Sequence, residues 1–164
     1  MNFKTLAVAS LLLASVAASA TTTNWGVHGA AQIGTGFALG ANTPIDDIFQ
    51  FSLTGTSDVI AVSVANDGAN GAFDLGNGEV SLFQVGNNTA LGTFSFDSTS
   101  ISHDFGALTA GNYYYEVMAV VAPTAQGGSY LLSSTLAPVS EPASYVLLLA
   151  GLSAIGLIAR RRRA

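Results

Sequence analysis

The sequence has no cysteine among its 164 residues. This absence excludes disulfides, thiolate zinc sites, iron–sulfur clusters and thiol catalysis. A domain of about 115 residues can still bury a stable hydrophobic core without such crosslinks. Whether the chain is exported must therefore be judged from its two ends rather than from cysteine pairing.

Basic residues are missing from the whole centre of the chain. Lys4 stands near the beginning, and the other four basic residues are the arginines at 160–163. Between Thr21 and Pro138 there is no Lys or Arg, whereas nine residues are acidic, which gives this segment a formal charge of −9. Nucleic-acid binding depends on neutralisation of phosphates by Lys and Arg, so nucleic acid is excluded as a partner.

Residues 1–20 have the three parts of a secretory signal peptide. Lys4 supplies the positive start, residues 6–16 (LAVASLLLASV) form the apolar run, and Ala18-Ser19-Ala20 is an A-x-A cleavage pattern. We therefore expect an N-terminal signal helix, export through the Sec translocon and cleavage by signal peptidase between Ala20 and Thr21. The mature domain then occupies residues 21–138.

A second apolar segment lies at the C-terminus. Residues 143–159 (ASYVLLLAGLSAIGLIA) contain no charged side chain. Seventeen helical residues span roughly 26 Å, which suffices for a transmembrane helix in a thin membrane. Basic residues after such a helix favour the cytoplasmic side, so the domain is expected on the periplasmic side of the inner membrane. The basic cluster consists of Arg160, Arg161, Arg162 and Arg163.

The lead-in to this helix makes the C-terminus more specific than an ordinary anchor. Ser140, Glu141 and Pro142, followed by the apolar helix and the arginine tail, resemble the PEP-CTERM sorting signal over residues 139–164. Ser140 stands where the family's first Pro usually lies, whereas Glu141 and Pro142 match. The resemblance implies an exosortase-type membrane protease as a partner. It also implies a membrane-anchored intermediate, cleavage near Glu141, and a final place at the cell surface or outside the cell.

The central segment shows alternation of apolar and polar residues rather than a helical period. Glycine and asparagine clusters, such as Asn87-Asn88, separate the alternating runs. Short strands at intervals of about ten residues are typical of an antiparallel all-β sandwich. We predict one such domain, with strands at 49–53, 59–64, 79–85, 90–96, 101–105, 113–121 and 129–136.

Two further resemblances concern this domain. The segment with Ile45, Asp47, Phe49 and Phe51 resembles the motif of the FxDxF group of PEP-CTERM proteins, with Ile45 in place of the first Phe. Residues 108–117 (LTAGNYYYEV) resemble bacterial pre-peptidase C-terminal domains. Those domains are jelly-roll-like β-sandwiches, so the resemblance implies that fold and a binding or accessory role. It transfers no catalytic residue.

No arrangement of residues specifies a reaction, so we expect that the protein is not an enzyme and has no catalytic residue. Only two histidines occur, and each is expected in a turn or on the surface. Ser102, His103 and Asp104 suggest a catalytic triad, but adjacent residues of a strand point to opposite faces and cannot form one relay. Gly34-Thr35-Gly36 misses the dinucleotide-binding pattern and is interpreted as a flexible loop.

Calcium and sugar binding have candidate residues. Oxygen ligands for Ca²⁺ could come from Asp67, Asn70, Asp74 and Glu79, although their spacing does not match an EF-hand loop. The alternative is a solvated acidic loop, in which Asp and Asn are ordinary turn residues. Trp25 and the tyrosines at 113–115 could stack on sugar rings, with Tyr113 and Tyr115 on one strand face and Tyr114 on the other.

Together these features predict an exported, surface-sorted, non-enzymatic protein. Its expected role is structural or adhesive, in an exopolysaccharide or biofilm matrix. The alternative is a calcium-dependent carbohydrate-binding module. A hydrolase, the third class, is disfavoured because no paired catalytic groups stand in a suggestive context.

Overall fold

The computed structural model describes residues 19–137 and residue 152. The predicted signal helix, the predicted transmembrane helix, the sorting motif and the arginine tail lie outside the described residues. Within the described part, no helix is long and apolar enough to cross a membrane. Residues 19–137 form one short 3₁₀ helix, η1 (Ala69–Gly71), and nine strands: β1 (Ser19–Val27), β2 (Ala31–Leu39), β3 (Pro44–Leu53), β4 (Ser57–Asn66), β5 (Leu75–Gln84), β6 (Gly92–Phe96), β7 (Ile101–Leu108), β8 (Gly111–Val121) and β9 (Gly127–Ala137).

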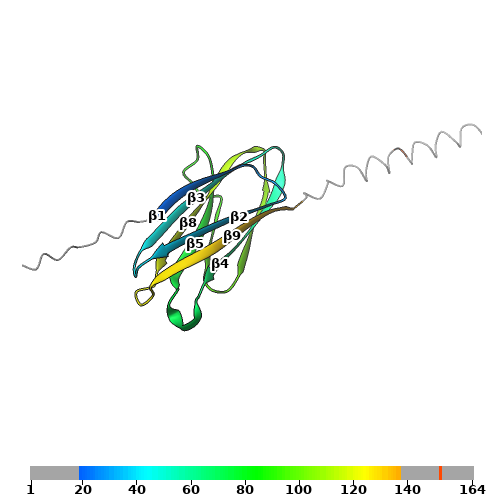
Figure 1. Cartoon of the computed structure of the whole chain (residues 1–164). Coiled ribbons are helices and arrows are strands. Elements are labelled where there is room, and N and C mark those ends of the chain that lie inside the picture. The colour runs from blue at the N-terminus through cyan, green and yellow to red at the C-terminus, as the bar shows by residue number, and fades with distance from the viewer. Residues whose placement is uncertain (1–18, 138–151, 153–164) are drawn as a thin grey trace, which may run out of the picture.

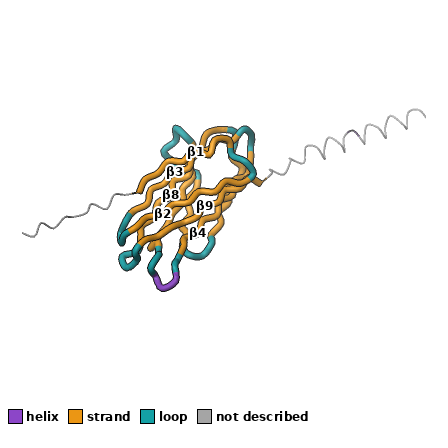
Figure 2. The backbone as a smooth tube through the Cα atoms, in the orientation of Figure 1, coloured by secondary structure: helices purple, strands orange, loops and turns teal. Residues whose placement is uncertain are grey.

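The strands form two sheets that face each other as a sandwich (Figures 1 and 2). The first sheet has the order β1-β3-β8-β5-β6, and the second has the order β2-β9-β4-β7. This arrangement confirms the predicted all-β sandwich. One pairing differs from the antiparallel expectation, because β1 runs parallel to β3. The chain reaches that arrangement by crossing to the second sheet as β2 before it returns as β3.

The core lies between the sheets and follows from the alternation of the sequence. In β3, every second residue from Ile45 to Leu53 is buried, while Asp46 and Gln50 face solvent. Strand β8 repeats this pattern, with Tyr113, Tyr115 and the following alternate residues buried. Because successive side chains of a strand point to opposite faces, one face of each strand contributes to the core. The other fully buried hydrophobic side chains include Val59, Val80, Leu82, Val117, Val121 and Leu132.

Strand β2 corrects the interpretation of Gly34-Thr35-Gly36 as a flexible loop. These residues pair in register with Leu132, Leu131 and Tyr130 of β9. A Cβ atom on Gly34 would collide with the ring of Phe49, and a Cβ atom on Gly36 would collide with Asp47 and Tyr130. The two glycines therefore allow the β2 backbone to approach the opposite sheet closely.

The described segment begins and finishes at opposite ends of the sandwich. In Figure 1, the blue start of β1 lies at one end and the orange end of β9 lies at the other. The N–H of Leu136 donates to the carbonyl of Ala30 at 3.1 Å, which places the end of β9 beside the loop between β1 and β2.

Candidate functional site

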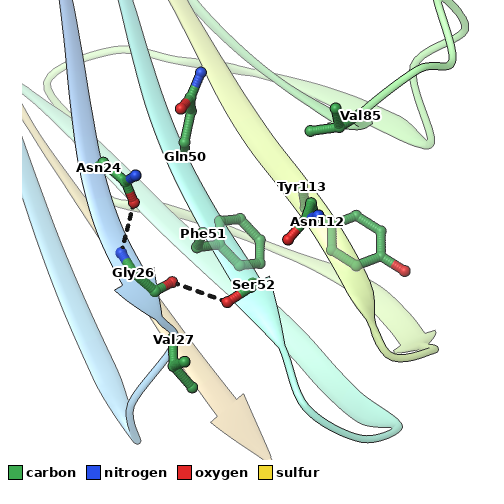
Figure 3. Close-up of a pocket in the computed structure, with 9 residues that line it drawn as sticks. All are labelled: Asn24, Gly26, Val27, Gln50, Phe51, Ser52, Val85, Asn112 and Tyr113. Carbon is green, nitrogen blue, oxygen red and sulfur yellow. Dashed lines mark hydrogen bonds between the residues drawn. The ribbon is translucent and has the colours of Figure 1, made fainter.

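An open hollow of about 470 Å³ lies over the ends of β1, β3 and β8 (Figure 3). Its lining includes Phe51 and Tyr113, whose side chains are buried in the core. The other lining residues are polar residues, a glycine and two exposed valines. The lining residues are Asn24, Gly26, Val27, Gln50, Phe51, Ser52, Val85, Asn112 and Tyr113.

A bulge in β1 shapes one wall of the hollow. The parallel register with β3 shifts between Asn24 and Gly26, so Trp25 is an extra residue in the strand. Gly26 has a φ of 70°, and its N–H donates to the side-chain oxygen of Asn24 at 2.7 Å. The Ser52 hydroxyl donates to the Gly26 carbonyl at 3.4 Å. Bulges of this kind redirect side chains and are common beside functional sites.

Strand register brings the polar groups of the hollow together. Asn24 of β1 is opposite Gln50 of β3, and Ser52 of β3 is opposite Asn112 of β8. Figure 3 shows the amide groups of Asn24 and Gln50 on neighbouring strands. Each amide offers two N–H donors and one carbonyl acceptor, which matches the donors and acceptors of sugar hydroxyls. The lining contains neither a carboxylate nor an imidazole.

The hollow lies at the end of the sandwich where β9 finishes. Val27 lines the hollow, and three residues later Ala30 accepts the hydrogen bond from Leu136, near the end of β9. The loop between β1 and β2 thus links the hollow to the last residues of the domain.

The four residues of the predicted family motif are buried in the core. Ile45, Asp47, Phe49 and Phe51 are each only 2% exposed. One oxygen of Asp47 accepts hydrogen bonds from the backbone N–H of Thr21 at 3.0 Å and from the Thr21 hydroxyl. The other oxygen accepts from the Tyr130 hydroxyl at 2.7 Å. Asp47 therefore links β3 to β1 and to β9 by side-chain hydrogen bonds.

The Leu108–Val117 segment also has a structural explanation. The Tyr113 hydroxyl donates to the carbonyl of Thr109 at 2.9 Å and so closes the turn between β7 and β8. Tyr113 and Tyr115 share the buried face of β8, as the alternation predicts. Tyr114 lies on the outer face, half-buried, and stacks on Phe83 with the ring centres 5.0 Å apart.

His28 is in the loop between β1 and β2, as a turn histidine would be, but it is buried rather than exposed. Its Nδ1 is 2.6 Å from the Gly29 carbonyl, and because a carbonyl can only accept, Nδ1 carries the proton. Its Nε2 is 2.8 Å from the hydroxyl of Ser134. Burial lowers the pKa of His28, although the hydrogen bond to Gly29 opposes that shift. Nε2 of the neutral imidazole therefore accepts a hydrogen bond from the Ser134 hydroxyl.

This serine–histidine contact was not predicted from the sequence, because the two residues are 106 positions apart. The Ser134 side chain is fully buried, so it cannot reach a substrate. The Tyr115 hydroxyl, 2.9 Å from the Ser134 oxygen, completes a buried network. Burial raises the pKa of Tyr115, and the bond to Ser134 only partly offsets this. Tyr115 is thus a neutral donor in the network.

His103 lies half-buried on β7 and stacks on Phe94, with ring centres 5.5 Å apart. Its neighbours Ser102 and Asp104 are exposed on the opposite face of the strand. This alternation confirms that the three consecutive residues do not form a relay.

The four calcium candidates are distributed over the chain between β4 and the middle of β5. Asp67 follows β4, Asn70 lies in η1 with a φ of 70°, and Asp74 precedes β5. Glu79 is in the middle of β5, where it pairs in register with Met118 and Ser95. In the described part of the chain, no three His, Cys, Asp or Glu residues are grouped closely enough to hold a metal ion.

Trp25 is only partly exposed and packs over the edge of the core. Its ring stacks on Phe49 with centroids 5.1 Å apart and meets His28 edge-on at 6.1 Å. With Tyr113 and Tyr115 buried as well, these aromatic side chains present no open platform for a sugar ring. The polar hollow was missed because its residues come from three strands. The Asn24-x-Gly26 turn pattern was its only local signal.

Residues 138–163 match the PEP-CTERM protein-sorting motif. This match confirms the resemblance that the Ser140-Glu141-Pro142 segment suggested. It supports an exported protein that passes through a membrane-anchored intermediate, is processed by an exosortase-type protease and is sorted to the surface. The chain thus combines a β-sandwich with a PEP-CTERM protein-sorting motif.

Comparison with curated protein sequences gives no match. Among solved structures, the chain is similar to the pre-peptidase C-terminal domain of collagenase from Bacillus anthracis (14% identity, TM-score 0.49, covering 70% of this chain and 94% of that one). It is also similar to the lysozyme inhibitor PliG from Aeromonas hydrophila (14% identity, TM-score 0.37, covering 73% of this chain and 100% of that one). A third similar structure is the Yersinia pseudotuberculosis-derived mitogen (15% identity, TM-score 0.39, covering 69% of this chain and 91% of that one). Because all three TM-scores lie below 0.5, the fold assignment rests on the two sheets themselves.

Proposed function

We propose that the protein is a non-enzymatic surface component that contacts neutral polysaccharide of the extracellular matrix through the hollow of Figure 3. The observation that supports this proposal most is the grouping of Asn24, Gln50 and Asn112 around an open hollow. Amides and hydroxyls form neutral hydrogen bonds with sugar hydroxyls, and the exposed side chains of Val27 and Val85 add apolar contacts with sugar rings. The absence of a carboxylate or imidazole from the lining leaves no acid–base pair for hydrolysis there.

The charge of the domain favours neutral over acidic glycans. The segment from Thr21 to Pro138 has nine acidic side chains and no Lys or Arg. An acidic polysaccharide would be repelled unless divalent cations bridged the two. The three amides, in contrast, need no counter-charge. A neutral glycan is therefore the ligand class that these residues suit.

The position of the hollow relates binding to sorting. Because the hollow lies at the end of the sandwich where β9 finishes, we infer that it is close to the membrane while the tail is anchored. Removal of the tail by the exosortase-type protease would open this end of the domain to the matrix. Contact with polysaccharide is then a property of the processed protein.

The test is a calorimetric titration of the purified chain with the neutral polysaccharide fraction of the cells that produce it. We expect weak, saturable binding with a Kd on the order of 1 mM per site, equivalent to about 4 kcal/mol. Replacing Gln50 and Asn112 together with Ala removes several hydrogen bonds. Each contributes roughly 1 kcal/mol, so the affinity should fall by at least about tenfold.

A matched control is Asn66→Ala, because Asn66 is also an exposed strand amide but lies at the far end of β4, away from the hollow. This variant should bind as the unaltered chain does. Equal binding by the Gln50/Asn112 variant would contradict the hollow as the site. Binding that requires added Ca²⁺ would contradict the metal-independent contact and favour the calcium-dependent module. Release of sugar fragments during the titration would contradict the non-enzymatic role.

A further inference from the structure

A buried carboxylate lies opposite the predicted start of the mature chain. Asp47 is 2% exposed, and its three hydrogen-bond donors are the Thr21 N–H, the Thr21 hydroxyl and the Tyr130 hydroxyl. In the precursor each of these donors is neutral. The domain has no Lys or Arg between residues 21 and 138 that could supply a positive charge. A buried carboxylate is costly to the folded state unless a cation accompanies it.

Strand β2 closes the space around this carboxylate. The backbone at Gly36 comes so close that a Cβ atom there would collide with Asp47 Oδ2 and with the ring of Tyr130. Burial raises the pKa of Tyr130, and the hydrogen bond and charge of Asp47 raise it further, so Tyr130 stays a neutral donor. Only the side of β1, where Thr21 lies, remains for a charged group to reach the carboxylate.

We propose that removal of the signal peptide creates the cation that Asp47 lacks, namely the α-ammonium group of Thr21. This inference rests on the predicted cleavage between Ala20 and Thr21 and is independent of glycan binding. Hydrolysis breaks the amide bond between these residues by adding one water molecule. The water oxygen joins the Ala20 carbonyl carbon, which leaves as a carboxylate, and the Thr21 nitrogen becomes an ammonium group.

The new ammonium group needs no movement to find its partner. The Thr21 nitrogen is already 3.0 Å from Asp47 Oδ1. Thr21 pairs in register with Asp47, and the pairing of β1 with β3 continues from there to Val27 and Ser52. Loss of Ser19 and Ala20 removes only the first two residues of that ladder. Cleavage thus converts a hydrogen bond from a neutral N–H donor into an ion pair between the α-ammonium group and the buried Asp47 carboxylate, and it makes the mature domain more stable than the precursor.

The ion pair has a defined pH dependence. An unpaired α-amino group loses its proton at about pH 8, and a carboxylate partner raises the pKa of the group in the folded state. The added stability is therefore complete below about pH 8 and is lost as the pH rises through the higher folded-state value. The group that faces the ammonium is Asp47 from β3, through Oδ1. The other oxygen of Asp47 is contacted by the hydroxyl of Tyr130 from β9 and by β2 backbone at Gly36.

The test compares three forms of the chain in detergent, all of which end at residue 164. The first begins at Thr21 with a free α-amine, the second begins at Thr21 with that amine acetylated, and the third begins at Ser19 and so retains Ser19 and Ala20. Residues 21–164 contain no Lys, so an acetylating reagent modifies no other amine. At pH 6.5 we expect the free-amine form to unfold roughly 5 °C above the other two. At pH 10.5 that difference should vanish.

The Asp47→Asn variant should remove the difference between the free and acetylated forms at pH 6.5. Should this variant fail to fold, the rate of α-amine acetylation at pH 7 provides a second measurement. We expect the folded unaltered chain to react several-fold more slowly than the same chain in urea. Equal unfolding temperatures of the free and acetylated forms at pH 6.5, or equal acetylation rates, would overturn the proposal.

Discussion

Several polar side chains of this protein are buried, and their burial determines their protonation state or their hydrogen bonds. His28 is held neutral between the Gly29 carbonyl and the hydroxyl of Ser134. Asp47, from a motif that the sequence singled out, is a structural acceptor rather than a surface ligand. The sequence could single out Asp47, because it lies in a strand where apolar and polar residues alternate regularly. The sequence could not predict the hydrogen-bond network of His28, because His28, Tyr115 and Ser134 are far apart in the chain.

His28 should make the domain sensitive to mild acid. Its pKa is lowered from the ordinary value of 6.5, mainly by burial, so the unfolded chain takes up the proton first as the pH falls. The stability is complete above about pH 6.5 and declines as the pH falls through the unfolded-state and then the folded-state pKa. Unfolding in urea, followed between pH 7.5 and pH 5, measures this decline.

The matched variant for this measurement is His28→Gln, which keeps a side-chain amide able to bond to Ser134 but cannot gain a proton in this range. We expect its stability to change less between pH 7.5 and pH 5 than that of the unaltered chain. Identical pH dependence of the two chains would show that His28 is not the group that titrates.

At the scale of elements, the strands that the sequence predicted are those with a regular alternation of apolar and polar residues. The seven strands from β3 to β9 fall near the predicted positions, with ends that differ by a few residues. Strands β1 and β2 were missed because Thr, Gly and Asn replace the apolar residues that mark a strand. In β2 the inward positions 34 and 36 are glycines, since larger side chains would collide with Phe49, Asp47 and Tyr130. Glycines are also common in loops, so the sequence alone does not distinguish these closely packed strand glycines from loop residues.

The close approach of β2 predicts a large effect of one methyl group. Gly36→Ala places a Cβ atom against the Asp47 carboxylate and the Tyr130 ring, so the strand must move outward. We expect a loss of about 1–3 kcal/mol in the free energy of unfolding, as for other overpacked cores. The control is Gly55→Ala, whose Cβ atom meets nothing within 4 Å. It should change stability by less than about 1 kcal/mol.

Urea unfolding of both variants gives the comparison directly. A Gly36→Ala chain as stable as the Gly55→Ala chain would mean that β2 does not lie as close to the first sheet as the structure shows. The same result would also weaken the argument that β2 closes the space around Asp47.

At the scale of the whole molecule, the chain consists of a folded β-sandwich domain and a C-terminal sorting motif. The domain contains all nine strands of the described chain, and the sorting motif follows at residues 138–163. The sequence predicted the sorting motif because such motifs are local patterns, and the signal peptide, which lies outside the described residues, stays a prediction. The sequence did not predict the polar hollow, because Asn24, Gln50 and Asn112 meet only through the parallel pairing of β1 with β3 and the antiparallel pairing of β3 with β8. The spacing of residues along the chain indicates neither pairing.

Mass spectrometry of the intact protein, recovered from the surface and medium of the cells that produce it, tests the central claim most directly. If the chain is exported and sorted through its PEP-CTERM motif, the mass should correspond to a chain that begins at Thr21 and finishes close to Glu141. Such a chain lacks the apolar segment and the four arginines. A mature protein that retains residues 143–164 would contradict the account, because the C-terminus would then be a permanent anchor rather than a processed sorting signal.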